Sequence, residues 1–210
     1  MQTIKSLGIL GGTFDPIHYG HMVAAECVRD AFHLDRIIFV PAARPPHKDP
    51  EGVLDSRHRF NMVVLAAQDN PNFEVSPMEL DRQGLSYTVE TVASCRQLYP
   101  AAEIYFILGT DALLLINTWK ELDRLLKLCH FILVTRPGYR LNRNDQRFRE
   151  IPDYLWKRTL ILPIPGLYIS SSEIRQRVTE GKTIKYLVPE GVEKYIVENN
   201  LYQDEEGTNA

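Results

Sequence analysis

One segment near the N-terminus restricts the fold of this chain more than any other. The apolar run at residues 7–10 predicts a first β-strand, and a helical pattern begins at His21. Between them lies segment 11–21, with the sequence GGTFDPIHYGH. Glycines let the backbone approach an anion, and a helix start presents unpaired N–H groups and the positive end of its dipole. The segment therefore predicts a phosphate site.

Two histidines at the mouth of this turn indicate more than binding. His18 and His21 are three residues apart and add donors that face the same space. The segment has neither the G-x-G-x-x-G pattern of dinucleotide-binding folds nor the G-x-x-x-x-G-K-[ST] pattern of P-loop enzymes. A loop that only binds phosphate does not need two histidines, so the pair indicates chemistry on a phosphate.

Composition excludes several classes of protein. The 210 residues suffice for one α/β domain with or without a small appendage. A net charge of -3 gives no global basic field for nucleic acid, and no apolar run is long enough to span a membrane. The first residues run directly into a strand, unlike a signal peptide. Cys27, Cys95 and Cys129 are odd in number and show no C-x-x-C spacing, which favours reduced thiols in a cytoplasmic protein.

Strand-like and helix-like runs alternate along the chain. This alternation predicts an α/β fold with a doubly wound parallel sheet, in which ligands bind beyond the carboxyl ends of the strands, near the switch point. Strands are expected at 7–10, 36–40, 73–76, 103–108, 131–135 and 159–162, and helices at 21–28, 56–67, 89–98 and 111–128, the last with a break near Asn117.

The last third predicts a small helical cap at about 168–202, within a single domain of residues 1–202. Ser170 at the N-cap and Glu173 three residues later fit a capping box, and Gly181 ends that helix. Pro189 begins a final helix. The polar residues 203–210 are expected to be a frayed tail.

The motifs resemble those of a known group. Segment 11–21 is similar to the nucleotidylyltransferase superfamily, whose hallmark is [HT]-x-G-H after the first strand, and its longer form matches bacterial nicotinate-nucleotide adenylyltransferases. Segment 169–175, ISSSEIR, resembles the family's I-S-S-[ST]-x-I-R element. Segment 86–91, SYTVET, resembles its S-Y-T element, with Glu90 where the family more often has aspartate. Matching motifs run from Leu7 to Arg175, whereas 136–159 and the residues after 181 carry no signal.

The resemblance implies transfer of AMP from ATP to nicotinate mononucleotide, giving nicotinate adenine dinucleotide and pyrophosphate in NAD biosynthesis. The acceptor phosphate is already anionic, so catalysis would rest on alignment and charge neutralisation rather than on a nucleophilic side chain. Mg²⁺ is expected to be held mainly by the phosphates and waters, with few protein ligands. Asp15, the carboxylate nearest the turn, could bind a metal-bound water or cap the turn, and the cap is favoured.

On the ATP side, the resemblance implies that His18 and His21 donate to the α-phosphate and the bridging oxygen, while Arg175 and Ser172 hold the β and γ groups. Lys48 would approach the leaving pyrophosphate from its loop. The expected catalytic residues are His18, His21, Lys48 and Arg175. The expected ATP contacts are Gly11, Gly12, Thr13, Phe14, His18, His21, Gly109, Asp111, Ile169, Ser171, Ser172 and Arg175.

Each of these assignments has a plainer alternative. Segment 109–111 suits a ribose at the end of a strand, but Thr110 or Asp111 could equally be a helix N-cap. Lys48 could be one more exposed lysine. The capping box alone explains Ser170, and Arg175 could then be a solvated residue of a well-capped helix.

On the acceptor side, the S-Y-T element opens a helix, and the family context places it with Trp119 around the pyridine ring. Backbone N–H groups there would receive the nicotinate carboxylate while Trp119 stacks on the ring. The alternative for Trp119 is core packing. The expected acceptor contacts are Thr13, Arg44, Lys48, Arg57, Ser86, Tyr87, Thr88 and Trp119.

Three rival functions differ in testable ways. The same chemistry could act on nicotinamide mononucleotide or phosphopantetheine, although a stacking platform at Trp119 suits a flat ring. A fragment related to class I aminoacyl-tRNA synthetases would share H-x-G-H, but the chain is short and has neither a K-M-S-K-S-like element nor a basic field for tRNA. A non-catalytic nucleotide sensor could dispense with one of the two histidines, and both are present. The sequence carries no signal for an oligomeric state.

Overall fold

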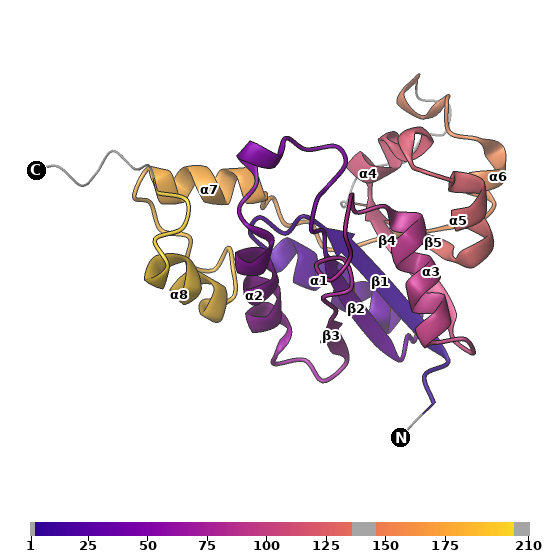
Figure 1. Cartoon of the computed structure of the whole chain (residues 1–210), viewed down its shortest axis with the longest axis horizontal. Coiled ribbons are helices and arrows are strands. Elements are labelled where there is room, and N and C mark those ends of the chain that lie inside the picture. Colours follow the sequence, from indigo (N-terminus) through magenta and orange to yellow (C-terminus); the bar gives the residue numbers. More distant parts are fainter. Residues whose placement is uncertain (1–2, 136–145, 204–210) are drawn as a thin grey trace, which may run out of the picture.

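The computed structural model describes residues 3–135 and 146–203, and its strands form one parallel sheet (Figure 1). The strand order is β3-β2-β1-β4-β5-β6, so the chain moves outward from β1 in one direction and then from β4 in the other. The strands are β1 (Ser6–Gly12), β2 (Arg36–Pro41), β3 (Phe73–Val75), β4 (Glu103–Gly109), β5 (His130–Thr135) and β6 (Thr159–Pro163). All six expected strands and the doubly wound parallel sheet are confirmed.

The helices also follow the predicted pattern. The helix expected at 111–128 is broken by a 3₁₀ turn at Ile116–Thr118, as the sequence indicated. The helices are α1 (Tyr19–Ala31), α2 (Ser56–Ala67), α3 (Thr88–Leu98), α4 (Thr110–Leu114), α5 (Leu122–Leu128), α6 (Asp153–Trp156), α7 (Ser171–Thr179) and α8 (Glu190–Glu198), with further 3₁₀ turns at Pro50–Gly52 and Gln146–Phe148.

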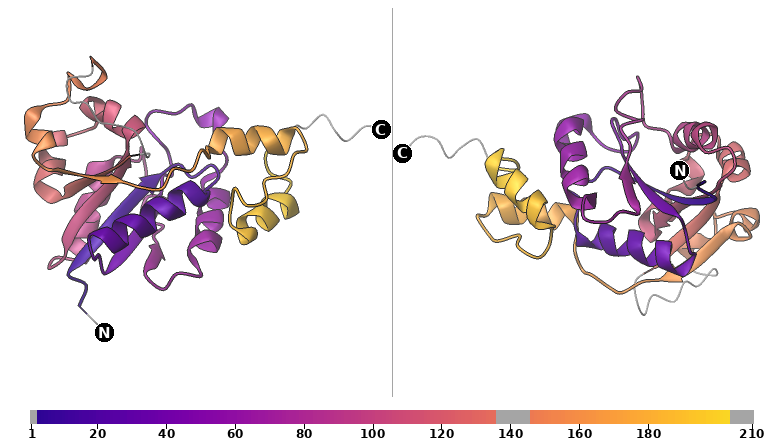
Figure 2. Two further views of the ribbon diagram at one scale, coloured as in Figure 1. Left: turned by 180° about the vertical axis from the view of Figure 1, so that it is seen from behind. Right: turned by 90° about the horizontal axis from the view of Figure 1, so that it is seen from below.

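Helices cover both faces of the sheet (Figure 2). Each face has its own apolar core. On one face, side chains of α1 and α2 such as Val28 and Met62 pack on β-strand residues such as Phe39. On the other, α3, α5 and α6 pack on residues such as Ile104. This two-sided burial explains why the central strands read as continuous apolar runs rather than alternating ones.

The C-terminal cap lies beside α2 (Figure 1). Ser170 is the N-cap of α7, because its Oγ accepts the Glu173 N–H at 3.2 Å, and Gly181 follows the helix with φ +63°. Pro189 is the N-cap of α8 rather than its first helical residue. Ile196 and other cap residues belong to the same core as α1 and α2. The tail expected to fray lies outside the described residues beyond position 203.

The strand order creates the place for a ligand. β1 and β4 are hydrogen-bonded neighbours, and the chain leaves their carboxyl ends, Gly12 and Gly109, toward opposite sides of the sheet. Such a switch point leaves a crevice that no connection fills. In the described ranges, none of the helices combines the length and the apolar character needed to cross a membrane.

Candidate active site

A cleft of about 800 Å³ lies at the carboxyl ends of β1, β4 and β5. It brings together residues of the first turn, the loop after β2, the start of α3 and the segment before α7. Of the residues predicted from the sequence, Gly11, Gly12, Thr13, His18, His21, Lys48, Ser86, Thr88, Gly109, Asp111, Trp119 and Ile169 line this cleft. Phe14, Arg44, Arg57, Tyr87, Ser171, Ser172 and Arg175 are not among its lining residues.

The two histidines are held as a stacked pair. Their ring centroids are 3.8 Å apart with an interplanar angle of 29°. His18 Nδ1 accepts the Gly20 N–H at 3.1 Å, and His21 Nδ1 accepts the His18 N–H at 3.3 Å. A neutral imidazole whose Nδ1 accepts a hydrogen bond carries its proton on Nε2. Both Nε2–H groups are therefore donors, and neither has an acceptor among the described residues.

Burial keeps both rings uncharged. It lowers the pKa of His18 to about 4. Burial also lowers the pKa of His21 well below its usual value, and the charges of His18 and Lys48 lower it further. At neutral pH the pair consequently offers two uncharged N–H donors rather than two cations.

The backbone N–H groups at the start of α1 are already occupied. Tyr19 N–H donates to Leu187 O at 3.0 Å, Gly20 N–H to His18 Nδ1, and His21 N–H to His18 O at 2.9 Å. The expectation that this helix start offers open amides to a phosphate is therefore wrong. The reason is that His18 is the N-cap and forms a capping box with His21. The imidazole Nε2 atoms take the place of the amides as donors.

Two neighbours fix the rings in place. A Cβ at Gly20 would lie 2.9 Å from the His18 ring, so a side chain there would displace the imidazole. The Phe14 ring meets His21 edge to face, with centroids 5.1 Å apart, and Phe14 is 2 % exposed. The Phe14 side chain thus supports His21 from the core, whereas the sequence had placed Phe14 among the ATP contacts.

Asp15 has a different role from the expected turn cap. It is 2 % exposed, and its Oδ1 accepts the Tyr202 hydroxyl at 2.8 Å. Its Oδ2 lies 3.7 Å from Arg175 Nη1. The cap interpretation is wrong because both partners come from the C-terminal part of the chain, which no local rule could supply.

The start of α7 reaches the first turn through two side chains. Arg175 Nη1 donates to Asp15 O at 2.7 Å, and Ser171 Oγ donates to Pro16 O at 2.8 Å. Ser172 is exposed, with its Oγ 3.2 Å from Ser170 Oγ. The N–H groups of Ser171 and Ser172 are the first two of the helix and by position have no intrahelical acceptor. The two predicted phosphate segments therefore converge.

Two further cations lie near this junction. Lys48 is exposed on its loop and lines the cleft; partial burial lowers its pKa, Asp15 raises it, and the Arg175 and Arg59 charges lower it. Arg59 is 1 % exposed, and its guanidinium donates to Leu54 O at 2.8 Å, Thr13 O at 2.7 Å and Ala43 O at 3.2 Å.

Sequence reasoning missed Arg59. The available signal was an arginine one turn before Met62 on the buried face of a predicted helix, where an arginine must find partners. By contrast, the side chain of Arg57 is exposed and outside the cleft, and its N–H is capped by Asp55 Oδ1 at 2.8 Å.

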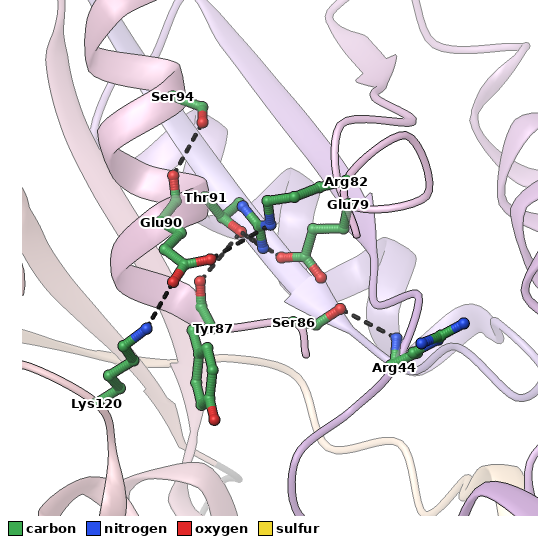
Figure 3. A network of polar contacts seen from close by, with 9 residues as sticks. All are labelled: Arg44, Glu79, Arg82, Ser86, Tyr87, Glu90, Thr91, Ser94 and Lys120. Carbon is green, nitrogen blue, oxygen red and sulfur yellow. Dashed lines mark hydrogen bonds and ion pairs between the residues drawn. The ribbon is translucent and has the colours of Figure 1, made fainter. Parts of the chain in front are cut away.

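The S-Y-T element is anchored to the loop after β2 (Figure 3). Ser86 N–H donates to Arg44 O at 2.9 Å, and Arg44 N–H donates to Ser86 Oγ at 3.1 Å. Tyr87 N–H donates to Leu85 O at 3.1 Å. Two of the three amides expected to receive a carboxylate are thus occupied. Thr88 remains, because it begins α3 and lines the cleft.

Glu79 is a second residue that sequence reasoning missed. It is 6 % exposed, lines the cleft, and accepts the Thr91 hydroxyl at Oε1 (Figure 3). No described donor meets its Oε2. Burial raises the pKa of this carboxyl, opposed by the hydroxyls of Thr91 and Ser86. No pattern in the sequence distinguishes Glu79 from an ordinary exposed glutamate.

Trp119 packs against the core and also lines the cleft, so its contact with an acceptor ring stays a prediction. It is half-buried, meets Phe106 edge to face with centroids 5.6 Å apart, and lines the cleft. Gly109 is the N-cap of α4, and no side chain caps that helix, so the alternative of an N-cap at Thr110 or Asp111 is wrong. Asp111 is exposed toward the cleft instead.

Comparison with known proteins identifies the family. The cytidylyltransferase-like family model matches residues 9–177. A probable nicotinate-nucleotide adenylyltransferase from Moorella thermoacetica is 52 % identical over 198 residues, which are 94 % of this chain and 91 % of that protein. A second, from Thermoanaerobacter sp., is 50 % identical over 207 residues, 98 % of either chain. This chain belongs to the nicotinate-nucleotide adenylyltransferase family.

A solved structure confirms the adenylyltransferase fold. The Plasmodium falciparum nicotinic acid mononucleotide adenylyltransferase complexed with NaAD superposes with a TM-score of 0.75 at 24 % identity, covering 94 % of this chain and 97 % of that one. The present family member is accordingly a nucleotidyltransferase of NAD biosynthesis with a Rossmann-like sheet.

Among the predicted contacts that do not line the cleft of this adenylyltransferase family member, Arg44 and Tyr87 have other neighbours. Arg44 is exposed and lines a separate pocket with Arg82, and Tyr87 lies under Lys120, whose Nζ is 4.4 Å from the ring centroid. Within the described residues, no three His, Cys, Asp or Glu side chains cluster as a metal site.

Proposed function

We propose that this chain transfers the adenylyl group of ATP to the phosphate of nicotinate mononucleotide. One observation carries the proposal: the stacked His18 and His21 present two Nε2–H donors to a cleft at the ends of β1 and β4. Preorganised uncharged donors suit a transition state whose negative charge is spread over phosphate oxygens.

The transfer needs no nucleophilic side chain. A phosphate oxygen of the mononucleotide attacks the α-phosphorus of ATP, the bond from that phosphorus to the bridging oxygen breaks, and pyrophosphate leaves with the electron pair. His18 and His21 donate to the α-phosphate and the bridging oxygen, where charge develops. The contribution of the protein is alignment and preorganised donors.

The start of α7 holds the outer phosphates. Arg175 keeps one N–H on Asp15 O and retains further guanidinium donors for the β and γ groups. The open N–H groups of Ser171 and Ser172 add to this grip, and Lys48 neutralises the departing pyrophosphate from its loop. Asp111 and Gly109 suit the ribose at the end of β4.

The acceptor occupies the side of the cleft between α3 and Trp119. The Trp119 ring offers a stacking surface for the pyridine, and the Thr88 N–H and Ser86 lie at the start of α3 for the nicotinate carboxylate. Arg44 and Arg57 do not enter this proposal because their side chains are exposed outside the cleft.

Magnesium fits this site as a companion of the nucleotide. The carboxylate of Asp15, beside the first turn, is committed to Tyr202 and Arg175, and no three acidic, His or Cys side chains of the described residues cluster as a metal site. Phosphate oxygens and waters would therefore be the main ligands of the ion. When bound, the ion neutralises phosphate charge and orients the leaving group. The cytoplasmic location expected from the cysteines stays a prediction. A shared core between cap and sheet supports our proposal of a single domain over residues 1–202.

Acceptor preference tests the proposal. With ATP and Mg²⁺, we expect pyrophosphate release to depend on nicotinate mononucleotide, and its kcat/KM to exceed that of nicotinamide mononucleotide by about tenfold or more, because the amide loses a charge-assisted hydrogen bond. The measurement is steady-state pyrophosphate release with each acceptor. No release with either acceptor would contradict the transfer, and equal kcat/KM values would contradict the acceptor assignment.

A further inference from the structure

The last described residues of the cap reach into the first turn of the chain. Tyr202 lies 187 positions after Asp15, yet its hydroxyl donates to Asp15 Oδ1 at 2.8 Å. Burial and the Asp15 charge raise the pKa of Tyr202, which keeps the hydroxyl protonated as a donor. A buried carboxylate that lost this donor would be costly to accommodate.

The backbone around this tyrosine is held in an unfavourable shape. Tyr202 has φ +62° and Asn200 has φ +51°, both in the left-handed region that non-glycine residues avoid. Thr179 Oγ1 donates to Tyr202 O at 2.9 Å and fixes the turn against α7. Such strain persists where surrounding contacts over-determine it, often next to a functional site.

Asp15 in turn faces Arg175. Arg175 Nη1 donates to the backbone O of Asp15 at 2.7 Å and stands 3.7 Å from its Oδ2, beyond hydrogen-bond distance. The other oxygen of the carboxylate, Oδ1, accepts the Tyr202 hydroxyl. The carboxylate therefore orients the Arg175 guanidinium without forming a direct hydrogen bond with it. This leaves the remaining N–H groups of Arg175 available for a ligand.

We propose that Tyr202 is a positioning residue for the phosphate grip of Arg175, and that it acts through Asp15. The inference rests on the proposed function, in which Arg175 binds the outer phosphates of ATP. Without the hydroxyl, Oδ1 of Asp15 has no donor, and the carboxylate draws the guanidinium toward itself and away from the triphosphate. The effect falls on ATP and leaves the acceptor side of the cleft unchanged.

A second tyrosine of the cap provides a matched control. The Tyr195 hydroxyl accepts the Asn61 amide at 2.9 Å and lies 3.0 Å from His58 Nδ1, so it joins α8 to α2 and does not touch the first turn. Tyr195→Phe and Tyr202→Phe each delete one hydroxyl that ties the cap to the rest of the protein. A purely structural role predicts the same outcome for both variants.

The experiment compares steady-state kinetics of the two variants below their unfolding temperatures. We expect Tyr202→Phe to raise the KM for ATP about five- to tenfold, with kcat and the KM for nicotinate mononucleotide within twofold of the unsubstituted protein. Tyr195→Phe leaves all three values within twofold. In an Asp15→Asn background the pull on Arg175 is absent, so adding Tyr202→Phe changes the KM for ATP by less than twofold.

Specific outcomes would overturn the inference. Equal KM values for ATP in Tyr202→Phe and Tyr195→Phe would do so, as would a rise of the KM for both substrates together. If Tyr202→Phe does not fold, Thr179→Val loosens the same turn and is expected to raise the KM for ATP about three- to fivefold; a change of less than twofold would reject the inference. An unsubstituted protein that fails to join ATP to nicotinate mononucleotide refutes the proposed function instead, so the two failures are distinguishable.

Discussion

The start of α1 lines the cleft, and the start of α7 lies against the turn that precedes α1, but the two helix starts offer different donors. At α1 the first amides are occupied, and two uncharged imidazoles present their Nε2–H groups instead. At α7 the Ser170 side chain caps the Glu173 amide, and the amides of Ser171 and Ser172, beside Arg175, have no acceptor among the described residues. A helix start is therefore not one kind of anion site.

The two regions also differ in burial and charge. His18 is 7 % exposed and uncharged, whereas the side chain of Arg175 is 34 % exposed and carries a full charge. Donors in a dry, rigid setting act most strongly on charge that appears during the reaction. A partly solvated cation contributes mainly to binding a charge that is always present. The start of α1 is thus suited to act at the reacting phosphorus, and the start of α7 is suited to bind the outer phosphates of ATP.

Alanine substitutions at the two helix starts give the largest expected effects on kinetics. His18→Ala or His21→Ala should lower kcat by about 10²–10³-fold with the fold retained, because a transition-state donor is lost. Ser172→Ala, at the exposed start of α7, should instead raise the KM for ATP about threefold and keep kcat. Steady-state kinetics with ATP varied checks both; kcat within tenfold of the unsubstituted protein for both histidine variants would break the comparison.

The burial of the histidines predicts a pH-dependent stability. The pKa of His18 is about 4 in the folded protein, below its usual value in an unfolded chain. Unfolding therefore takes up a proton when the pH lies between these values, and the free energy of unfolding falls as the pH drops from about 6.5 toward 4. The loss from His18 alone reaches about 3 kcal/mol.

Urea unfolding at several pH values measures this loss. His18→Gln should flatten the slope between pH 6.5 and 4, whereas His33→Gln, at an exposed position after α1, should leave it unchanged. An unaltered slope in His18→Gln would mean that the first helix start is not a site of buried neutral donors, and the contrast with α7 would weaken.

A smaller effect is expected from the glycine between the histidines. The Cβ of Gly20→Ala would meet the His18 ring at 2.9 Å, which moves the imidazole from its place and should lower kcat about tenfold. Gly191→Ala on α8 is the control, because its Cβ would meet Leu65 at an ordinary 3.5 Å. Matching kcat values for the two variants would show that ring position at α1 is not critical.

The sequence predicted the fold well because each strand is a short local signal. The runs that became β4 and β5 are nearly continuous in apolar residues, and the polar break near Asn117 marked the 3₁₀ turn after α4. The placement of many site residues followed as well, since the ends of β1 and β4 meet at the switch point in any sheet of this order.

The errors concern partners that lie far away in the sequence. The position of Asp15 in the first turn predicted a turn cap, but its partner Tyr202 lies 187 positions away in the sequence. The same distance problem concealed Arg59, whose contact with Thr13 O spans 46 positions. The amides at α1 were misjudged because histidine is an unusual N-cap. The Ser86 amide is occupied by the backbone O of Arg44, in a loop that precedes it by about forty residues.

Arg59 ties the Thr13 turn and the Ala43 loop together through carbonyl groups, with Leu54 as a third anchor. A guanidinium held by these three carbonyls couples the two loops. Neither loop can move unless the other moves with it or a buried charge-assisted hydrogen bond breaks. The loop that carries Lys48, five positions after Ala43, is therefore fixed relative to the turn that carries His18 and His21. Arg44, the residue after Ala43, is hydrogen-bonded to Ser86 in both directions, so the start of α3 is held in the same arrangement.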